Sequence, residues 1–190
     1  MSLYQDIDHV LISKESIQKK VQALGRRITR DYANERPLLV CILKGSVVFF
    51  ADLIRNIDLP LSIDFMTYSS YQGDIQPTYD IGLVQDLNCS IENRHVIIVE
   101  DIVDTGHTLN ELIRMLGFRK PKSVVVAALL NKTARREAEV PVQYYGFDIP
   151  DEFVVGYGMD YGEEELYRNL PDICVLKKEV YFNDESGSRV

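Results

Sequence analysis

The stretch VIIVEDIVDTGHT, residues 96–108, decides the fold. It starts with four apolar residues in a row, which is typical of a strand that is buried on both faces. Two adjacent carboxylates, Glu100 and Asp101, come next, followed by a short loop with one glycine and two threonines, residues 104–108. Leucine and isoleucine then recur at helical spacing up to residue 116. A buried strand that passes through a polar loop into a helix predicts an α/β unit.

The same alternation of strands and helices runs along most of the chain. Three other apolar runs have the length of a strand: residues 38–43, 63–68 and 124–130. Helical periodicity is found at residues 13–28 and 47–55, where Ser13 and Ser46 are candidate N-terminal caps. Strands that are apolar on both faces and alternate with helices predict an α/β fold with a mainly parallel central sheet flanked by helices.

In such a sheet, ligands bind beyond the carboxyl ends of the strands. Glu100 and Asp101 stand at such an end, where desolvation makes an unpaired charge costly, so these carboxylates need hydroxyls or a metal ion as partners. The loop leads into a helix start at which Thr108 and Glu111 have the capping-box spacing. Backbone N–H groups and the helix dipole form an anion site there. Together these features suggest a phosphorylated sugar; the alternative is a pair of solvated loop acids beside an ordinary turn.

Two other phosphate-handling classes are excluded by spacing. A Walker A loop needs GxxxxGK[ST], which the chain lacks. Phosphatases of the haloacid type carry a DxD pair after the strand, whereas Asp101 and Asp104 are spaced DxxD. The three cysteines lie far apart without a CxxC pair, so neither a disulfide framework nor a zinc site is expected.

The composition limits which other classes of protein are possible. The 190 residues carry 29 Asp and Glu against 21 Lys and Arg, a net charge of -8, which disfavours binding to nucleic acid or to an anionic membrane. No apolar run approaches the roughly 18 residues of a membrane span, and the sequence MSLYQDIDHV does not resemble a signal peptide. We expect one domain, residues 1–190, in the cytoplasm, with a frayed polar tail at residues 183–190.

Residues 99–108, VEDIVDTGHT, resemble the phosphoribosyl-pyrophosphate signature of type I phosphoribosyltransferases. Other segments are similar to the 6-oxopurine branch of that family, hypoxanthine-guanine phosphoribosyltransferase: LKGS at 43–46, SSY at 69–71, LLNK at 129–132 and FDIPDEFVVGYGMDY at 147–161. The five motifs occur in the order of the family, and the resemblance covers about residues 10 to 178. It implies the type I phosphoribosyltransferase fold, with a small hood region built from the chain ends.

The resemblance implies transfer of a ribosyl 5'-phosphate from phosphoribosyl pyrophosphate to N9 of a purine, with Mg²⁺ present and release of pyrophosphate. Glu100 and Asp101 would hold the ribose 2' and 3' hydroxyls. Asp104 would exchange a proton with the purine N7, or would only orient the base. The 5'-phosphate would be cradled by the loop Asp104, Thr105, Gly106, His107 and Thr108. His107 stands where many relatives have lysine or a small residue, so a modest effect on phosphate affinity and pH dependence is expected.

For pyrophosphate, the resemblance implies contacts from Lys44, Gly45 and Arg168, and the peptide between Lys44 and Gly45 can be cis in the family. Asp160 is the expected carboxylate for a second magnesium, through water, and Glu100 and Asp101 complete the expected metal set. The spacer from Gly162 to Tyr167 is about two residues longer than usual, which weakens the assignment of Arg168. The acids at 163–165 are interpreted as a solvated face rather than as ligands.

For the purine, the resemblance implies that Lys132 donates to O6, that Phe153 stacks on the ring, and that Val154 and Asp160 border the base edge. Ser70 and Tyr71 would begin a lid, residues 70–78, that excludes water; an ordinary hairpin loop is the alternative.

The leading hypothesis is therefore a purine salvage enzyme that converts hypoxanthine, and guanine, to the nucleoside monophosphate. A regulator that binds nucleic acid and uses phosphoribosyl pyrophosphate only as an effector is the main alternative, and a transferase for another base is a third. Relatives form dimers and tetramers, so a homodimer or homotetramer is expected. The sequence does not rank hypoxanthine, guanine and xanthine.

Overall fold

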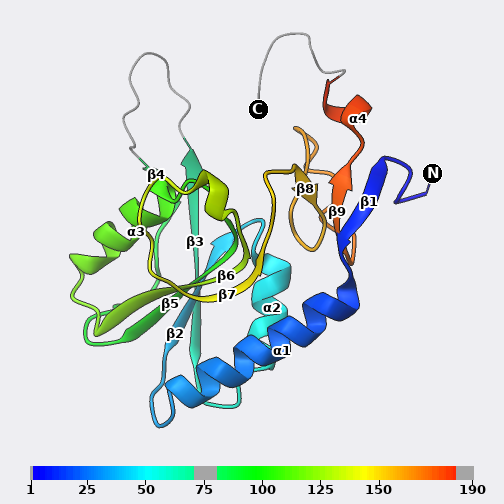
Figure 1. Cartoon of the computed structure of the whole chain (residues 1–190). Coiled ribbons are helices and arrows are strands. Elements are labelled where there is room, and N and C mark those ends of the chain that lie inside the picture. The colour runs from blue at the N-terminus through cyan, green and yellow to red at the C-terminus, as the bar shows by residue number, and fades with distance from the viewer. Residues whose placement is uncertain (1, 71–80, 183–190) are drawn as a thin grey trace.

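A six-stranded sheet forms the centre of the protein in a computed structural model that describes residues 2–70 and 81–182 (Figure 1). Its strand order is β4-β3-β2-β5-β6-β7. The strands are β2 (Leu38–Leu43), β3 (Ser62–Ser70), β4 (Ile81–Gln85), β5 (His95–Val103), β6 (Ser123–Asn131) and β7 (Val142–Asp148). All neighbours pair in parallel except β4, which runs antiparallel to β3 at one edge. The predicted mainly parallel α/β sheet is confirmed.

The central strands bury both of their faces, which explains their continuous apolar sequences. On β2, Leu39 and Cys41 belong to one hydrophobic core, while Leu38, Val40 and Ile42 belong to a second core on the opposite face. This split follows from the two-residue repeat of a strand. Helices on opposite sides of the sheet cover the two cores.

Helices α1 (Lys14–Asp31) and α2 (Val47–Arg55) cover the first core, and α3 (His107–Gly117) covers the second (Figure 1). The Ser13 cap is confirmed, because its side chain accepts a hydrogen bond from the Ser16 N–H. Ser46 stands at the N-cap position of α2, but its side chain does not cap the helix. Its buried hydroxyl donates instead to the Ile42 carbonyl at 2.5 Å, so it joins the start of α2 to the end of β2.

A second, three-stranded antiparallel sheet is built mostly from the two ends of the chain, as the hood prediction requires. Its order is β1-β9-β8, with β1 at Ile7–Ile12, β8 at Val154–Val155 and β9 at Ile173–Leu176. A short helix, α4 (Lys178–Phe182), follows β9, and a 3-10 turn (Thr133–Arg135) follows β6. The hood sheet stands beside the carboxyl ends of the central strands (Figure 1), where it can close one side of a site.

Strand β5 is longer than the sequence predicts, because it does not end at the carboxylates. Glu100 pairs with Ala128 and Val103 pairs with Asn131 on β6. Hydrogen bonding to the neighbouring strand thus keeps two acidic residues in the strand, although their strand propensity is low. Both acids are held by regular backbone at the rim of the sheet rather than by a loop.

Cys41 and Cys174 are buried and Cys89 is exposed, and all three are free thiols. Across residues 2–70 and 81–182, none of the helices combines the length and the apolar character that crossing a membrane requires.

Candidate functional site

The carboxyl ends of β2, β5 and β6 lie next to one another and carry most of the residues singled out from the sequence. Lys44 follows β2, Glu100 and Asp101 lie near the end of β5, and Lys132 follows β6. Neighbouring parallel strands therefore place a cation, two acids and a second cation along one edge of the sheet.

Glu100 is buried and Asp101 is half-buried. Burial, and then the charge of Asp101, raise the pKa of Glu100 well above its usual range, and the Tyr68 hydroxyl donates to Glu100 Oε1 at 2.8 Å. Burial raises the pKa of Asp101 to about 6, although Asp101 Oδ1 accepts from the Ile102 N–H at 2.7 Å. Neither acid forms an ion pair within the described residues. Such a pair is suited to hydroxyl donors or to a cation.

Two glycines bring separate segments against this acid pair. A Cβ on Gly45 would lie 1.8 Å from Asp101 Oδ2, and a Cβ on Gly158 would lie 2.1 Å from the Gly45 carbonyl oxygen. Three segments that are far apart in the sequence thus meet at van der Waals distance. The cis peptide of this region joins Leu43 to Lys44, so the expectation of a cis bond between Lys44 and Gly45 is wrong by one residue.

Helix α3 begins with an N-terminal turn that no side chain caps. Gly106 is the N-cap residue, with φ of 89°, a conformation that favours glycine. The expected capping box from Thr108 to Glu111 is wrong, because the helix already begins at His107 and Thr108 lies within its first turn. Since glycine has no side chain to satisfy the first N–H groups, these donors are left for a ligand or water.

A pair of arginines that the sequence reading missed braces the loop before α3. Arg136 Nε donates to the Asp104 carbonyl at 3.0 Å, and its Nη2 donates to Asn131 Oδ1 at 2.6 Å. The Thr105 carbonyl accepts from two backbone N–H groups, those of Glu137 and Ala138. The two adjacent arginines shortly after the LLNK motif were the available signal. The loop is therefore held by the segment that follows β6.

His107 is the first residue of α3, and its Nε2 is 2.8 Å from Glu137 Oε2. The two carboxylate oxygens of Asp104 have different surroundings. Oδ2 lies 3.2 Å from Arg135 Nη1, whereas Oδ1 is buried without a hydrogen-bond partner among the described residues. A buried acceptor without a partner is rare and points to a ligand that supplies the missing proton.

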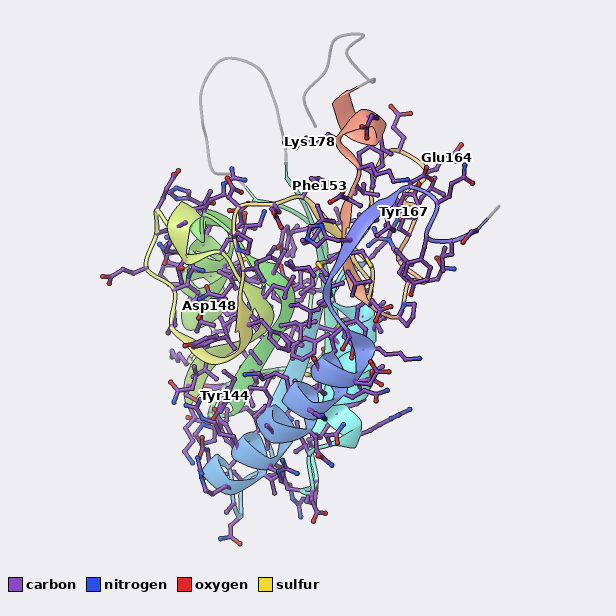
Figure 2. All side chains as sticks on the ribbon, turned by 45° about the vertical axis from the view of Figure 1, so that its right-hand side comes forward. Tyr144, Asp148, Phe153, Glu164, Tyr167 and Lys178 are labelled. Carbon is purple, nitrogen blue, oxygen red and sulfur yellow. The ribbon has the colours of Figure 1, made fainter. Side chains whose placement is uncertain are left out.

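Lys132 is 7% exposed, which is unusual for a lysine. Its Nζ lies 3.5 Å from Asp151 Oδ1, a long contact that Arg135 shares at 3.6 Å. Phe153 is 43% exposed and meets the edge of the Tyr161 ring, with 5.6 Å between ring centres, while Val154 is buried in β8. The labelled Phe153 lies at the side of the hood that borders the central sheet (Figure 2). A buried ammonium group and an exposed aromatic face thus border the same end of the molecule.

Arg168 lies at this site, although the spacer before it is longer than usual. Its Nη1 donates to the Gly158 carbonyl at 2.6 Å, and its Nη2 lies 2.9 Å from Asp160 Oδ1. Its Nε is buried without a hydrogen-bond partner among the described residues. The extra residues form a turn between Tyr161 and Leu166, which pair through an antiparallel bridge. The turn takes up the added length, so Arg168 stays beside Asp160.

The acids at 163–165 are all exposed, as expected for a solvated face, but the last of them also forms two ion pairs. Glu165 Oε1 accepts from Lys44 Nζ at 2.5 Å, and its Oε2 lies 3.4 Å from Arg168 Nη2. Two side chains predicted to bind an anion are thus already joined by a carboxylate of the chain itself.

Comparison with known proteins agrees with this arrangement. A family model described as the phosphoribosyl transferase domain matches residues 11–162. The chain belongs to the phosphoribosyltransferase family. A hypoxanthine-guanine phosphoribosyltransferase of Staphylococcus epidermidis is 52% identical over 180 residues, which cover 94% of this chain and 99% of that protein.

A crystal structure of a hypoxanthine phosphoribosyltransferase from Staphylococcus aureus has a TM-score of 0.89 and 48% identity, and covers 94% of this chain and 96% of that one. The bifunctional protein TilS/HprT of Listeria monocytogenes is 45% identical over 95% of this chain, which spans only 28% of the length of that relative. The phosphoribosyltransferase resemblance and its fold are thus confirmed.

The acids of this phosphoribosyltransferase fit magnesium by their chemistry. Glu100, Asp101 and Asp160 offer carboxylate oxygens, and the charges of Arg168 and Asp160 both act on Asp101. Within the described residues no three His, Cys, Asp or Glu side chains form a ready metal cluster. A magnesium ion here would therefore take further oxygens from substrate and water, which is its usual preference.

The predicted lid of the phosphoribosyltransferase lies almost entirely outside the described residues. Ser70 is the last residue of β3 and pairs with Ile81 of β4, and Tyr71 belongs to the segment that is not described.

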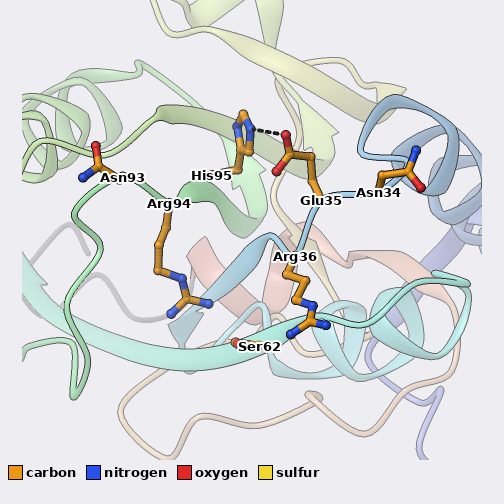
Figure 3. Close-up of a pocket in the computed structure, with 7 residues that line it drawn as sticks. All are labelled: Asn34, Glu35, Arg36, Ser62, Asn93, Arg94 and His95. Carbon is orange, nitrogen blue, oxygen red and sulfur yellow. Dashed lines mark ion pairs between the residues drawn. The ribbon is translucent and has the colours of Figure 1, made fainter.

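A separate hollow lies at the opposite end of the phosphoribosyltransferase sheet, where β2, β3 and β5 begin (Figure 3). Arg36 and Arg94 extend along the same side on either side of Ser62, and His95 Nε2 lies 3.6 Å from Glu35. This hollow faces away from the carboxyl ends of the strands and shares no residue with the candidate site.

Proposed function

We propose that the protein is a hypoxanthine-guanine phosphoribosyltransferase, which converts phosphoribosyl pyrophosphate and hypoxanthine or guanine to IMP or GMP and pyrophosphate. The observation that carries the proposal is the buried Glu100 and its half-buried neighbour Asp101 beside the uncapped start of α3, with the buried Lys132 directly after the next strand. The names of the full-length relatives support the same reaction. The role in purine salvage follows from that reaction.

The sugar phosphate would be bound at the end of β5. Glu100 and Asp101 would accept hydrogen bonds from the ribose 2' and 3' hydroxyls. These bonds would offset the cost of desolvating two carboxylates that form no ion pair among the described residues. The 5'-phosphate lies against the first N–H groups of α3, where the hydroxyls of Thr105 and Thr108 add donors. The same carboxylates favour a ribose that becomes positively charged at C1.

The purine would lie between Lys132 and Phe153. The Lys132 ammonium donates to O6, and this donor selects a 6-oxo over a 6-amino base, because an amino group cannot accept the bond. Phe153 supplies stacking surface from the hood, and Val154 and Asp160 border the ring edge.

Pyrophosphate would be bound by Lys44, the close backbone at Gly45, and Arg168, whose buried Nε lacks a partner among the described residues. Magnesium, held by Asp160 with Glu100 and Asp101 and by substrate oxygens, would supply positive charge against the diphosphate.

The reaction forms a bond from the purine N9 to C1 of the ribose, while the bond from C1 to the pyrophosphate oxygen breaks and its electron pair leaves with pyrophosphate. The purine loses one proton. Asp104 Oδ1, which is buried without a partner among the described residues, is placed to accept that proton at N7.

The test is a steady-state assay with phosphoribosyl pyrophosphate, magnesium and each of hypoxanthine, guanine, xanthine and adenine. We expect product from hypoxanthine and guanine and little from adenine. Absence of product from every base would exclude the enzyme and favour the regulator, which the names of the relatives do not support.

Two further features of the protein belong to the same proposal. We also propose that the protein forms a homodimer or homotetramer. Sedimentation velocity of the purified protein tests this assembly. A cytoplasmic location is tested by cell fractionation with detection of the native chain.

A further inference from the structure

Glu165 occupies the space between two cations of the proposed pyrophosphate site. Each carboxylate oxygen contacts a different partner: Oε1 lies 2.5 Å from Lys44 Nζ, and Oε2 lies 3.4 Å from Arg168 Nη2. Lys44 follows β2 and Arg168 precedes β9, so the carboxylate joins the central sheet to the segment that leads into the hood. A carboxylate that bridges two such cations takes the position that an oxygen of a diphosphate would need.

The turn that presents Glu165 is short and well hydrogen-bonded. Tyr161 and Leu166 exchange both backbone hydrogen bonds at 3.1 Å, and the Glu165 N–H donates to the Gly162 carbonyl at 3.0 Å. Glu165 has φ of 53°, in the left-handed region that favours glycine or asparagine. The backbone alone therefore does not favour glutamate at this position, and the two ion pairs are the contacts its side chain makes there.

Resting on the proposed function, we propose that Glu165 sets the affinity for pyrophosphate by competing with it for Lys44 and Arg168. The Glu165 carboxylate and a diphosphate cannot occupy the same position between Lys44 and Arg168, and two anions side by side there repel each other. The carboxylate must leave before a diphosphate binds, and its return assists the departure of pyrophosphate. Glu165 is thus an affinity-determining residue, and the chain carries its own competitor in the spacer between Asp160 and Arg168.

Glu164, the neighbour of Glu165, provides a matched control. It has the same charge, lies in the same turn and is likewise exposed, but it forms no ion pair among the described residues. Figure 2 shows Glu164 at the outer edge of the molecule. A general loss of negative charge from the turn would affect both positions equally, whereas competition for Lys44 and Arg168 concerns Glu165 alone.

The experiment compares Glu165→Gln and Glu164→Gln in the full chain by calorimetric titration with magnesium pyrophosphate, together with product inhibition by pyrophosphate. For Glu165→Gln we expect the Kd and the inhibition constant to fall about five- to tenfold, the scale of two partly exposed ion pairs. The KM for phosphoribosyl pyrophosphate should fall in parallel. For Glu164→Gln the change should stay below about twofold.

A second variant guards against a folding effect. Glu165→Gly removes the carboxylate and suits the left-handed backbone, so it should keep the turn and also tighten pyrophosphate binding. Equal changes in Glu165→Gln and Glu164→Gln, or weaker binding in both Glu165 variants, would overturn the inference. The proposed function fails separately, if the unmodified protein neither binds magnesium pyrophosphate nor forms product.

Discussion

The Cα atom of Gly45 lies against the carboxylate of Asp101, so that a Cβ at residue 45 would stand 1.8 Å from Asp101 Oδ2. This contact joins the end of β2 to the end of β5. It leaves no space for any side chain at residue 45 unless the carboxylate moves. The proposed pyrophosphate and ribose contacts therefore depend on one another.

Gly45→Ala should lower kcat/KM for phosphoribosyl pyrophosphate about 100-fold, because a displacement on the order of 1 Å at a reacting group has that scale of effect. Gly117→Ala is the control, since a Cβ there meets nothing within 4 Å. Steady-state kinetics of both variants check the prediction. Normal kinetics for Gly45→Ala would show that the contact of Gly45 with Asp101 does not matter for the reaction.

Asp104→Asn should reduce kcat about 100- to 1,000-fold while the KM for phosphoribosyl pyrophosphate changes only a few-fold. The amide cannot accept the purine proton, and the loss of a general base has this magnitude. Asp58→Asn serves as the control, because Asp58 is exposed and is not one of the candidate site residues. Turnover of Asp104→Asn within a few-fold of the unmodified protein would leave Asp104 only the orienting role.

Lys132→Met should raise the KM for hypoxanthine about 10- to 100-fold, because a buried charged donor to the ligand is lost while the length of the side chain is kept. The preference for hypoxanthine over adenine should shrink by a similar factor. Competition assays with both bases measure it, with the exposed Lys19→Met as the control. An unchanged preference would remove Lys132 from the base site.

Asp64 gives a prediction on stability and pH. This carboxylate is 5% exposed and accepts from the backbone N–H groups of Phe65 and Asn88 and from the Asn88 side chain. Burial raises the pKa of Asp64, but the hydrogen bonds from Asn88 and Phe65 outweigh it and leave the pKa below its usual value. The folded protein therefore binds this proton less tightly than the unfolded chain.

The stability that Asp64 contributes is present above about pH 4 and is lost as the pH falls through the lowered pKa. Asp64→Asn should cost about 2 kcal/mol of unfolding free energy at pH 7, the scale of hydrogen bonds to a buried charge. The difference from the unmodified protein should shrink below pH 4. Urea denaturation between pH 3 and pH 7 measures this, and a difference independent of pH would contradict the assignment.

The sequence predicts those parts of the fold that depend on periodicity. The apolar runs at 38–43 and 124–130 are β2 and β6, which alternate between two cores, and the cap at Ser13 stands where a helix begins. Such patterns are local, because each strand or helix must bury its own apolar face. The candidate site was expected at the ends of these strands because ligands bind beyond the carboxyl ends of parallel strands.

Contacts between segments were not predictable in this way. Glu165 reads as one acid among three, and only the turn from Tyr161 to Leu166 brings its carboxylate to Lys44, 121 residues earlier. Ser46 has the residue type and position of a cap, yet its hydroxyl donates a hydrogen bond to the carbonyl of Ile42. Tertiary contacts decide such cases, since several partners satisfy the same local pattern.

The pairing of β1 with β9 bears on how the protein is made. Ile7 lies opposite Leu176, so the first strand of the hood has no partner until β9 has left the ribosome. Val154, proposed to border the purine, pairs with Val175 of the same late strand. The central sheet can assemble from residues 38–148 while synthesis continues. The proposed base side of the site is therefore completed only after β9 has been synthesised, later than the strands of the central sheet.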